Sequence, residues 1–128
     1  MKIYTSYFAN IKKLPKNIIP ISISRFPPKW FNGIMFKQLA PSKEILLNYK
    51  GNHKLYIQKY TAEILDNLNA TDIYNQLQEL SNGYDIALVC FEKPTDFCHR
   101  HIVSKWLNEK LNLNVLEYEP ILDEIPLF

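Results

Sequence analysis

The segment from Ile86 to Leu111 constrains the fold more than any other part of the chain. It opens with the apolar run Ile86-Ala87-Leu88-Val89, which is typical of a buried strand. It closes with apolar residues at helical spacing, namely Ile102, Val103, Trp106, Leu107 and Leu111. Between the two, residues 90–100 hold both cysteines, one of the three histidines, two acids and an arginine. A strand that leads into a helix is the repeating unit of α/β folds. This segment therefore predicts such a fold, with a polar cluster at the carboxyl end of a strand, where ligands usually bind.

The rest of the chain repeats this alternation. Apolar and β-branched segments predict strands at residues 2–8, 17–24, 85–91 and 114–118. Apolar spacing predicts a helix that begins after Pro41-Ser42 and further helices at residues 55–68, 71–82 and 98–111. The chain therefore predicts one domain, residues 1–128, with a small, mostly parallel, Rossmann-like α/β sheet of about four or five strands flanked by helices.

Three local features refine this prediction. We expect Pro20 near the start of its strand, because proline cannot donate a hydrogen bond within a sheet. We expect Ile57 on the apolar stripe of the second helix, whose residues recur at steps of three and four. Thr95 or Asp96 is the expected N-cap of the last helix, because short polar side chains accept hydrogen bonds from the first turn.

Composition bounds the class of protein but does not select a partner. The net charge of +2 is only mildly basic, and no apolar run approaches the roughly 18 residues of a membrane helix. The first residues lack the apolar core of a signal peptide. Two cysteines do not make a secreted disulfide framework, so we expect reduced thiols in a soluble, cytoplasmic protein without a membrane partner.

Cys98, His99 and Arg100 fall at the start of the last predicted helix. A helix N-terminus and a neighbouring cation both lower the pKa of a thiol, so Cys98 could act as a nucleophile or a ligand. The alternative is structural, with Cys98 as a small buried residue and Arg100 paired with Glu92. A cysteine phosphatase is disfavoured, because its phosphate loop needs five residues between cysteine and arginine.

Two further possibilities involve both thiols. Cys90, Glu92, Cys98 and His99 could bind zinc or iron, although their spacing matches no standard zinc knuckle. A disulfide between Cys90 and Cys98 could form across the loop and act as a redox switch.

A second cluster follows the predicted strand at residues 17–24. If that strand lies beside the one ending at Cys90, Arg25 and Arg100 converge on one crevice that would suit a phosphate or carboxylate. In the alternative, Arg25 pairs with Glu92, and the aromatic loop around Trp30 only covers the core.

Other candidates are weaker. Tyr60 fits a core aromatic better than a proton donor, although its hydroxyl would need a partner if buried. Lys12, Lys13 and Lys16 fit a solvated face. Interleaved with the aromatic residues of the first strand, they could also contact a nucleic-acid backbone.

The run IALVCFEKPTDFCHRHIV, residues 86–103, resembles the signature of the bacterial and phage DUF488 family (domain of unknown function 488). That signature is an apolar strand ending in Cys-x-Glu, a loop with proline, and Cys-His-Arg opening a helix. Ile23-Ser24-Arg25-Phe26-Pro27 resembles the family's Asp-Val-Arg followed by proline, but serine stands where the acid is expected. The first strand matches more weakly.

The resemblance implies a compact α/β domain with these residues around one pocket. It leaves two classes of function open: an enzyme acting on a small anionic or nucleotide-like ligand, and a non-catalytic module that binds nucleic acid or protein. For the enzyme, the predicted catalytic residues are Cys98, His99 and Glu92. The predicted ligand-binding residues are Arg25, Arg100, Cys90, Tyr60 and Trp30. No particular cofactor is predicted.

Overall fold

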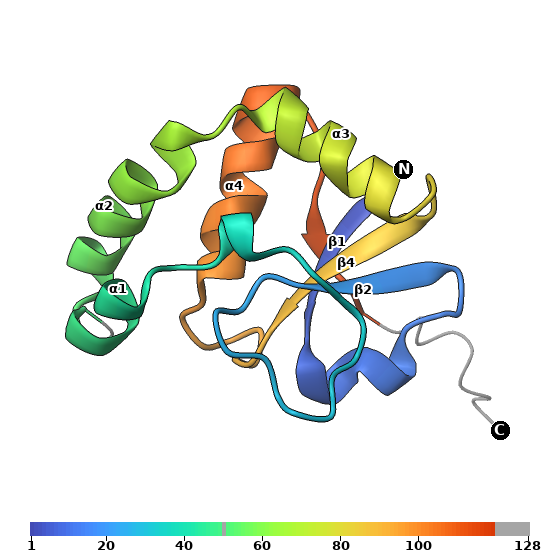
Figure 1. Ribbon diagram of the computed structural model, residues 1–128, viewed down its shortest axis with the longest axis horizontal. Helices are drawn as coiled ribbons and strands as arrows, with labels where there is room; N and C mark the ends of the chain where they lie inside the picture. The colour runs from blue at the N-terminus through green and yellow to red at the C-terminus, as the bar shows by residue number, and fades with distance from the viewer. Residues whose placement is uncertain (50, 120–128) are drawn as a thin grey trace, which may run out of the picture.

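The computed structural model describes residues 1–49 and 51–119. Its centre is a five-stranded sheet in the order β3-β2-β4-β1-β5, in which every neighbouring pair is parallel. The strands are β1 (Ile3–Tyr7), β2 (Ile18–Ser22), β3 (Ile34–Met35), β4 (Asp85–Cys90) and β5 (Leu116–Glu117). Figure 1 shows β1, β4 and β2 side by side at the centre.

Among the described residues, four α-helices and three short 3₁₀-helices connect these strands. The α-helices are α1 (Lys43–Asn48), α2 (His53–Glu63), α3 (Ala70–Leu80) and α4 (His99–Leu111). The 3₁₀-helices are η1 (Phe8–Lys13), η2 (Lys37–Leu39) and η3 (Leu65–Asn67). The predicted α/β fold with a parallel sheet flanked by helices is confirmed.

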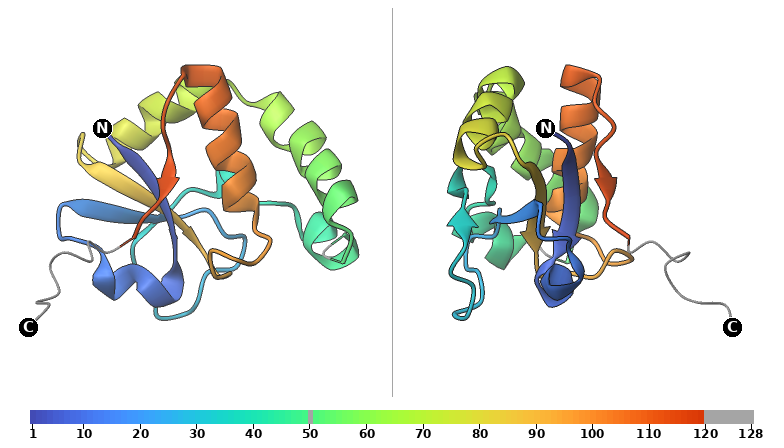
Figure 2. Two further views of the ribbon diagram at one scale, coloured as in Figure 1. Left: turned by 180° about the vertical axis from the view of Figure 1, so that it is seen from behind. Right: turned by 90° about the vertical axis from the view of Figure 1, so that its right-hand side faces the viewer.

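The two faces of the sheet are covered differently. One face carries the large core, in which Ile86 and Leu88 pack with side chains from all four α-helices. Figure 2 shows the arrangement of these helices around the sheet. The other face carries a smaller cluster around Phe8, Ala87 and Val89, to which η1 and the loop after β2 contribute. Alternation along β4 explains the division, because successive side chains of a strand point to opposite faces.

Strand register brings the functional candidates to one edge. β2 pairs with β4 so that Ser22 lies opposite Val89, and β1 pairs with β4 so that Tyr7 lies opposite Cys90. The carboxyl ends of three parallel strands therefore meet at the same edge. β2 and β4 lie side by side, as the prediction of a crevice shared by Arg25 and Arg100 requires.

Pro20 occupies the middle of β2 rather than its start. β3 is only two residues long and pairs with Ile21 and Ser22, so at Pro20 this side of β2 has no neighbouring strand among the described residues. A proline is tolerated there because no partner requires its missing N–H group.

Helices α2 and α4 differ from expectation in detail. Tyr56 and Tyr60 are the buried residues of α2, and Ile57 is 41% exposed, so the predicted position of Ile57 on the core stripe is wrong. The N-cap of α4 is Cys98, and its side chain makes no capping hydrogen bond, so the predicted cap at Thr95 or Asp96 is also wrong. Within the described residues, no helix has the length and apolar character needed to cross a membrane.

Candidate functional site

Cys90 and Cys98 are joined by a disulfide. Cys90 is the last residue of β4 and Cys98 immediately precedes α4, so the connecting loop folds back and brings its two ends together. Both side chains are buried. The expectation of two reduced thiols is therefore corrected, and the disulfide that the loop allowed is the form observed.

His99 is held in one orientation by the end of β2. Its Nε2 lies 2.7 Å from the carbonyl oxygen of Ile23, and its Nδ1 lies 3.8 Å from Sγ of Cys98. Burial lowers the pKa of His99 to about 4. The hydrogen bond to Ile23 opposes this shift, and the positive charge of Arg100 adds to it. The imidazole is therefore neutral at pH 7. Because a carbonyl only accepts, Nε2 carries the proton and Nδ1 presents its lone pair to Cys98.

Arg100 points to the other side of the sheet edge and is fully buried. Its Nε and Nη2 donate to the two carboxylate oxygens of Glu117 on β5, at 3.0 and 3.1 Å. Its Nη1 donates to the carbonyl oxygen of Glu92 at 2.7 Å and to Sγ of Cys90 at 3.2 Å. The ion pair of Arg100 thus involves Glu117, and the contact to Glu92 is made by the main chain.

A cavity of about 900 Å³ opens on the His99 side of this edge. Cys98 and His99 form part of its wall, with Glu92 and Arg25 nearby. Aromatic side chains supply much of the remaining wall, from the loop after β2, from α2 and from the loop before α4: Phe26, Tyr56, Phe91 and Phe97. A set of polar groups in a largely apolar cavity is the usual arrangement of a small-molecule site.

Arg25 is half-buried at the cavity wall. Its Nε donates to the carbonyl oxygen of Pro41 at 3.0 Å, which fixes the side chain along the wall. Arg100 does not line this cavity, so the two arginines lie on different sides of the edge and not in one crevice. Arg25 and Glu92 form no ion pair among the described residues.

Three other predicted ligand-binding residues also lie outside the cavity wall, and the first of them, Cys90, is buried in the disulfide. Tyr60 is fully buried on α2, donates its hydroxyl to the carbonyl oxygen of Leu39 at 2.6 Å, and has its pKa raised by burial. Trp30 is 61% exposed and packs edge-on against Phe8 and Phe31. Their ligand-binding roles stay predictions.

Several residues of the site were not predicted from the sequence. His53 stacks on Phe97 at 4.1 Å between ring centroids, and Tyr56 packs edge-on against the same ring. Burial and the charge of Glu92 raise the pKa of Tyr56. No local pattern marks α2 as a cavity wall. Glu117 could have been noticed, because an acid in a short final strand is a natural partner for a buried arginine.

The disulfide also determines whether this group of residues could bind a metal ion. One ligand atom each of Cys90, Cys98 and His99 lies within 4.8 Å of the others. Thiolates are good zinc ligands and disulfide sulfurs are not, so this group could hold a metal ion only after reduction.

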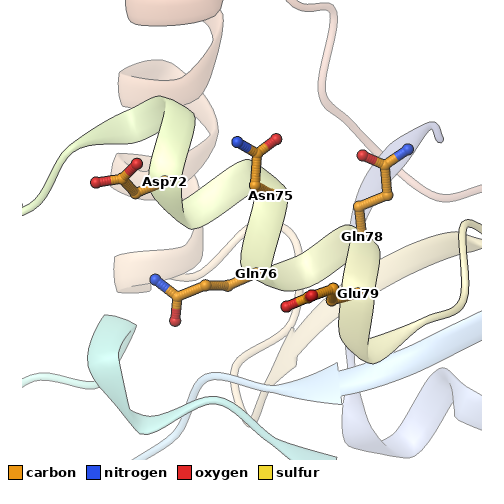
Figure 3. A pocket seen from close by; sticks show the side chains of 5 residues that line it. All are labelled: Asp72, Asn75, Gln76, Gln78 and Glu79. Atoms are coloured by element: carbon orange, nitrogen blue, oxygen red, sulfur yellow. The ribbon is translucent and has the colours of Figure 1, made fainter.

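A second hollow of about 580 Å³ lies over α3, away from these residues. Figure 3 shows its lining, which consists of acid and amide side chains along the helix: Asp72, Asn75, Gln76, Gln78 and Glu79. Gln38 of η2 donates a hydrogen bond to Gln76 at 2.7 Å. These groups form the solvated face of an amphipathic helix and bring no reactive side chain together.

Comparison with known proteins places the chain in a family. Residues 3–111 match the family DUF488-N3a, described as the active DUF488-N3 subclade. The chain belongs to the DUF488 family. The match includes the disulfide, His99, Arg25 and Arg100 of this DUF488 domain, and it ends before Glu117, the partner of Arg100. No curated protein and no solved structure matches the chain.

Proposed function

We propose that this DUF488 protein is an enzyme whose reduced form uses Cys98 as a nucleophile toward a small anionic or nucleotide-like ligand in the cavity. The observation that carries the proposal is the orientation of His99, whose Nδ1 faces Sγ of Cys98 while Nε2 is bound to Ile23. A third group that orients a base toward a nucleophile is the geometric signature of covalent catalysis.

His99 serves as a general base in this scheme. Because Nε2 donates to the carbonyl oxygen of Ile23, Nδ1 carries no proton and is able to accept the thiol proton as Cys98 attacks. Cys98 also precedes the first turn of α4, whose unpaired N–H groups and dipole stabilise negative charge on sulfur. Both effects act on Sγ of Cys98 at the cavity wall.

The chemistry begins with reduction of the disulfide. An external dithiol supplies two electrons and two protons, giving thiols at Cys90 and Cys98 and a disulfide in the reductant. Sγ of Cys98 then bonds to an electrophilic atom of the ligand while the bond from that atom to its leaving group breaks. The thiol proton passes through Nδ1 of His99 to the leaving group, and Glu92, which also lines the cavity, supplies a second acid or base.

The cavity wall supports the proposed ligand class. The guanidinium of Arg25 is anchored through one nitrogen, and bidentate recognition of a phosphate or carboxylate is the usual use of such a group. Lys43 adds a second cation to the wall. Phe26, Phe91 and Phe97 offer apolar and π surface for a planar ring.

The test is the rate of alkylation of each cysteine after reduction with dithiothreitol, measured by mass spectrometry. We expect Cys98 to react faster than Cys90, and Cys90→Ser to leave its rate unchanged. His99→Phe is the matched variant that removes the base and should slow the reaction of Cys98. Slow alkylation of both cysteines in the wild-type protein would contradict the nucleophile.

One observation favours a second candidate, which is a zinc or iron site. The close approach of ligand atoms from Cys90, Cys98 and His99 would suit a metal with one position open to the cavity. Elemental analysis of protein purified under reducing conditions separates the two. Stoichiometric metal with protected thiols assigns the metal site, and its absence together with one fast thiol assigns the nucleophile.

A further inference from the structure

Charge is distributed very unevenly along the chain. Residues 1–43 hold eight of the 15 Lys and Arg residues and none of the 13 Asp and Glu residues, and Glu44 is the first acid. The eight cations are Lys2, Lys12, Lys13, Lys16, Arg25, Lys29, Lys37 and Lys43. The net charge of +2 conceals this, because all the acids lie in the rest of the sequence. Such asymmetry indicates an anionic partner.

The fold gathers part of this basic segment beside the cavity. Lys12 and Lys13 form the last turn of η1, and Lys29 lies in the loop after β2. All three are exposed. Figures 1 and 2 show η1 and this loop together beyond the carboxyl ends of β1 and β2. Contacts of Phe8 on η1 with Trp30 and Phe31 join the two segments, at 6.1 and 5.3 Å between ring centroids.

Aromatic rings lie exposed among these lysines. Phe26, Trp30 and Phe91 are 60%, 61% and 51% exposed, which is unusual for side chains of this size. Exposed aromatic rings beside cations are the features with which proteins bind single-stranded nucleic acid, because bases stack on the rings and phosphates contact the cations. We define the basic aromatic surface as Lys12, Lys13, Phe26, Lys29, Trp30 and Phe91.

This surface continues into the cavity. Phe26 and Phe91 belong to both, and Arg25 lies on the wall directly before Phe26. Phe91 also contacts Phe8 at 4.9 Å between ring centroids. The first residue of η1 is therefore in contact with a side chain that lines the cavity. The acids at that mouth are Glu92 and Asp96, and none lies on η1 or on the loop after β2. Phosphates would therefore follow the lysines, with a base directed inward.

We propose that the basic aromatic surface binds a single-stranded nucleic acid and directs one of its nucleotides into the cavity beside Cys98. Binding to the surface is independent of catalysis, whereas the role of the inserted nucleotide as substrate rests on the proposed function. Charge complementarity selects a polyanion, and the exposed rings select unpaired bases over a duplex, whose bases are already stacked.

The test is the affinity of the protein for a fluorescent single-stranded oligonucleotide of about 12 nucleotides, followed by anisotropy over a series of salt concentrations, since one domain of this kind covers roughly 4–16 nucleotides. Lys12→Gln with Lys13→Gln should weaken binding about tenfold and reduce the salt slope by roughly 1.4, because each phosphate contact contributes about 0.7 for a single strand. Trp30→Ala should weaken it roughly five- to a hundredfold without changing the slope.

The matched control is Lys105→Gln with Lys110→Gln, which removes two exposed charges from α4 on another part of the molecule. It should leave the affinity within about twofold, since a distant charge outside a Debye length of roughly 10 Å is screened. Equal losses in the two double variants, binding that ignores salt, or equal affinity for a duplex of the same length would each overturn the proposal. Failure to bind any oligonucleotide at 50 mM salt would overturn it as well.

Insertion of a nucleotide is measured separately, by the alkylation rate of Cys98 in reduced protein. A saturating oligonucleotide should slow alkylation at least tenfold, and the Lys12/Lys13 variant should lose this protection at the same concentration. Binding without protection refutes the insertion step. If Cys98 is alkylated slowly even without the oligonucleotide, but the oligonucleotide binds and slows alkylation further, this inference stands and the nucleophilic role of Cys98 is refuted. The failure of this inference and the failure of the proposed function are therefore distinguishable.

Discussion

The two sides of the carboxyl edge use similar residues for different purposes. On one side, Arg100 makes four hydrogen bonds to Glu117, Glu92 and Cys90 and has no exposed surface. On the other side, Arg25 makes one hydrogen bond to the carbonyl oxygen of Pro41 and borders a cavity of about 900 Å³. One arginine therefore holds the edge together, and the other lines a cavity. Residue type alone does not distinguish the two roles.

The largest expected effect on stability comes from breaking the Arg100 side. Arg100→Met leaves Glu117 charged and mostly buried, which should lower the free energy of unfolding by about 3–5 kcal/mol. Arg25→Met removes one partly exposed hydrogen bond and should cost about 1 kcal/mol. Urea unfolding of both variants measures the difference. Arg100→Met combined with Glu117→Leu should recover most of the loss, and equal costs at the two arginines would contradict the division.

The sequence predicted where the carboxyl edge of the sheet lies, but not that His99 and Arg100 would lie on different sides of it. A strand followed by a polar loop and a helix placed Cys90, Cys98 and His99 at the carboxyl end of a parallel strand, and the family signature agreed. The separation of His99 from Arg100 depends on which way successive residues in the first turn of α4 point. That direction depends on β5, which is only two residues long, and on α2, whose role as a cavity wall follows from no local pattern.

Prediction of the helices and strands succeeded where periodicity was strong. Strands β1, β2 and β4 lie within one or two residues of their expected ranges. The failures lie where tertiary contacts override local pattern. Tyr56 replaces Ile57 in the core because its ring packs against Phe97, and Cys98 begins α4 because its disulfide fixes the chain there.

A second, somewhat smaller effect is expected from pH on the His99 side of the oxidised protein. Burial lowers the pKa of His99 from 6.5 to about 4, so between these values the unfolded chain binds a proton that the folded protein does not. Stability should therefore be fully present above pH 6.5 and fall as the pH drops toward 4. The loss should be on the order of 3 kcal/mol, since one pKa unit corresponds to about 1.4 kcal/mol.

The measurement is urea unfolding at several pH values between 4 and 7. His99→Gln can still donate to Ile23 but has no group that titrates in this range, so its stability should depend much less on pH. Burial also lowers the pKa of His101, so His101→Gln measures how much of the pH dependence of stability comes from His101. If the stability of His99→Gln falls with pH as steeply as that of the wild type, His99 is not the source of the pH dependence.

A third effect concerns the disulfide that joins the two sides. Reduction opens a loop that spans eight residues, and the chain-entropy estimate for a loop of this length is about 2.5 kcal/mol of stability. The protein should remain folded after reduction, with a lower urea midpoint. Cys90→Ser with Cys98→Ser is the control, because its midpoint should not respond to dithiothreitol. Complete unfolding on reduction would show that the loop holds the edge and would exclude a reduced, active form.

The smallest effect on stability, and the most specific one, is expected at Arg25. Arg25→Ala should weaken the binding of a nucleoside monophosphate about tenfold or more, because a hydrogen bond to a charged group is worth roughly 1.5–3 kcal/mol. Titration calorimetry measures the affinity, and urea unfolding should show a cost of only about 1 kcal/mol from the lost bond to Pro41.

Arg25→Lys is the matched variant, since it keeps the charge and loses the planar fork. Its affinity should lie between those of the wild type and Arg25→Ala. Lys110→Ala, at an exposed position in the last turn of α4, controls for a general loss of positive charge and should leave the affinity within about twofold. If all three variants bind as the wild type does, the cavity recognises its ligand without Arg25. The contrast between a structural and a ligand-facing arginine would then hold only for stability.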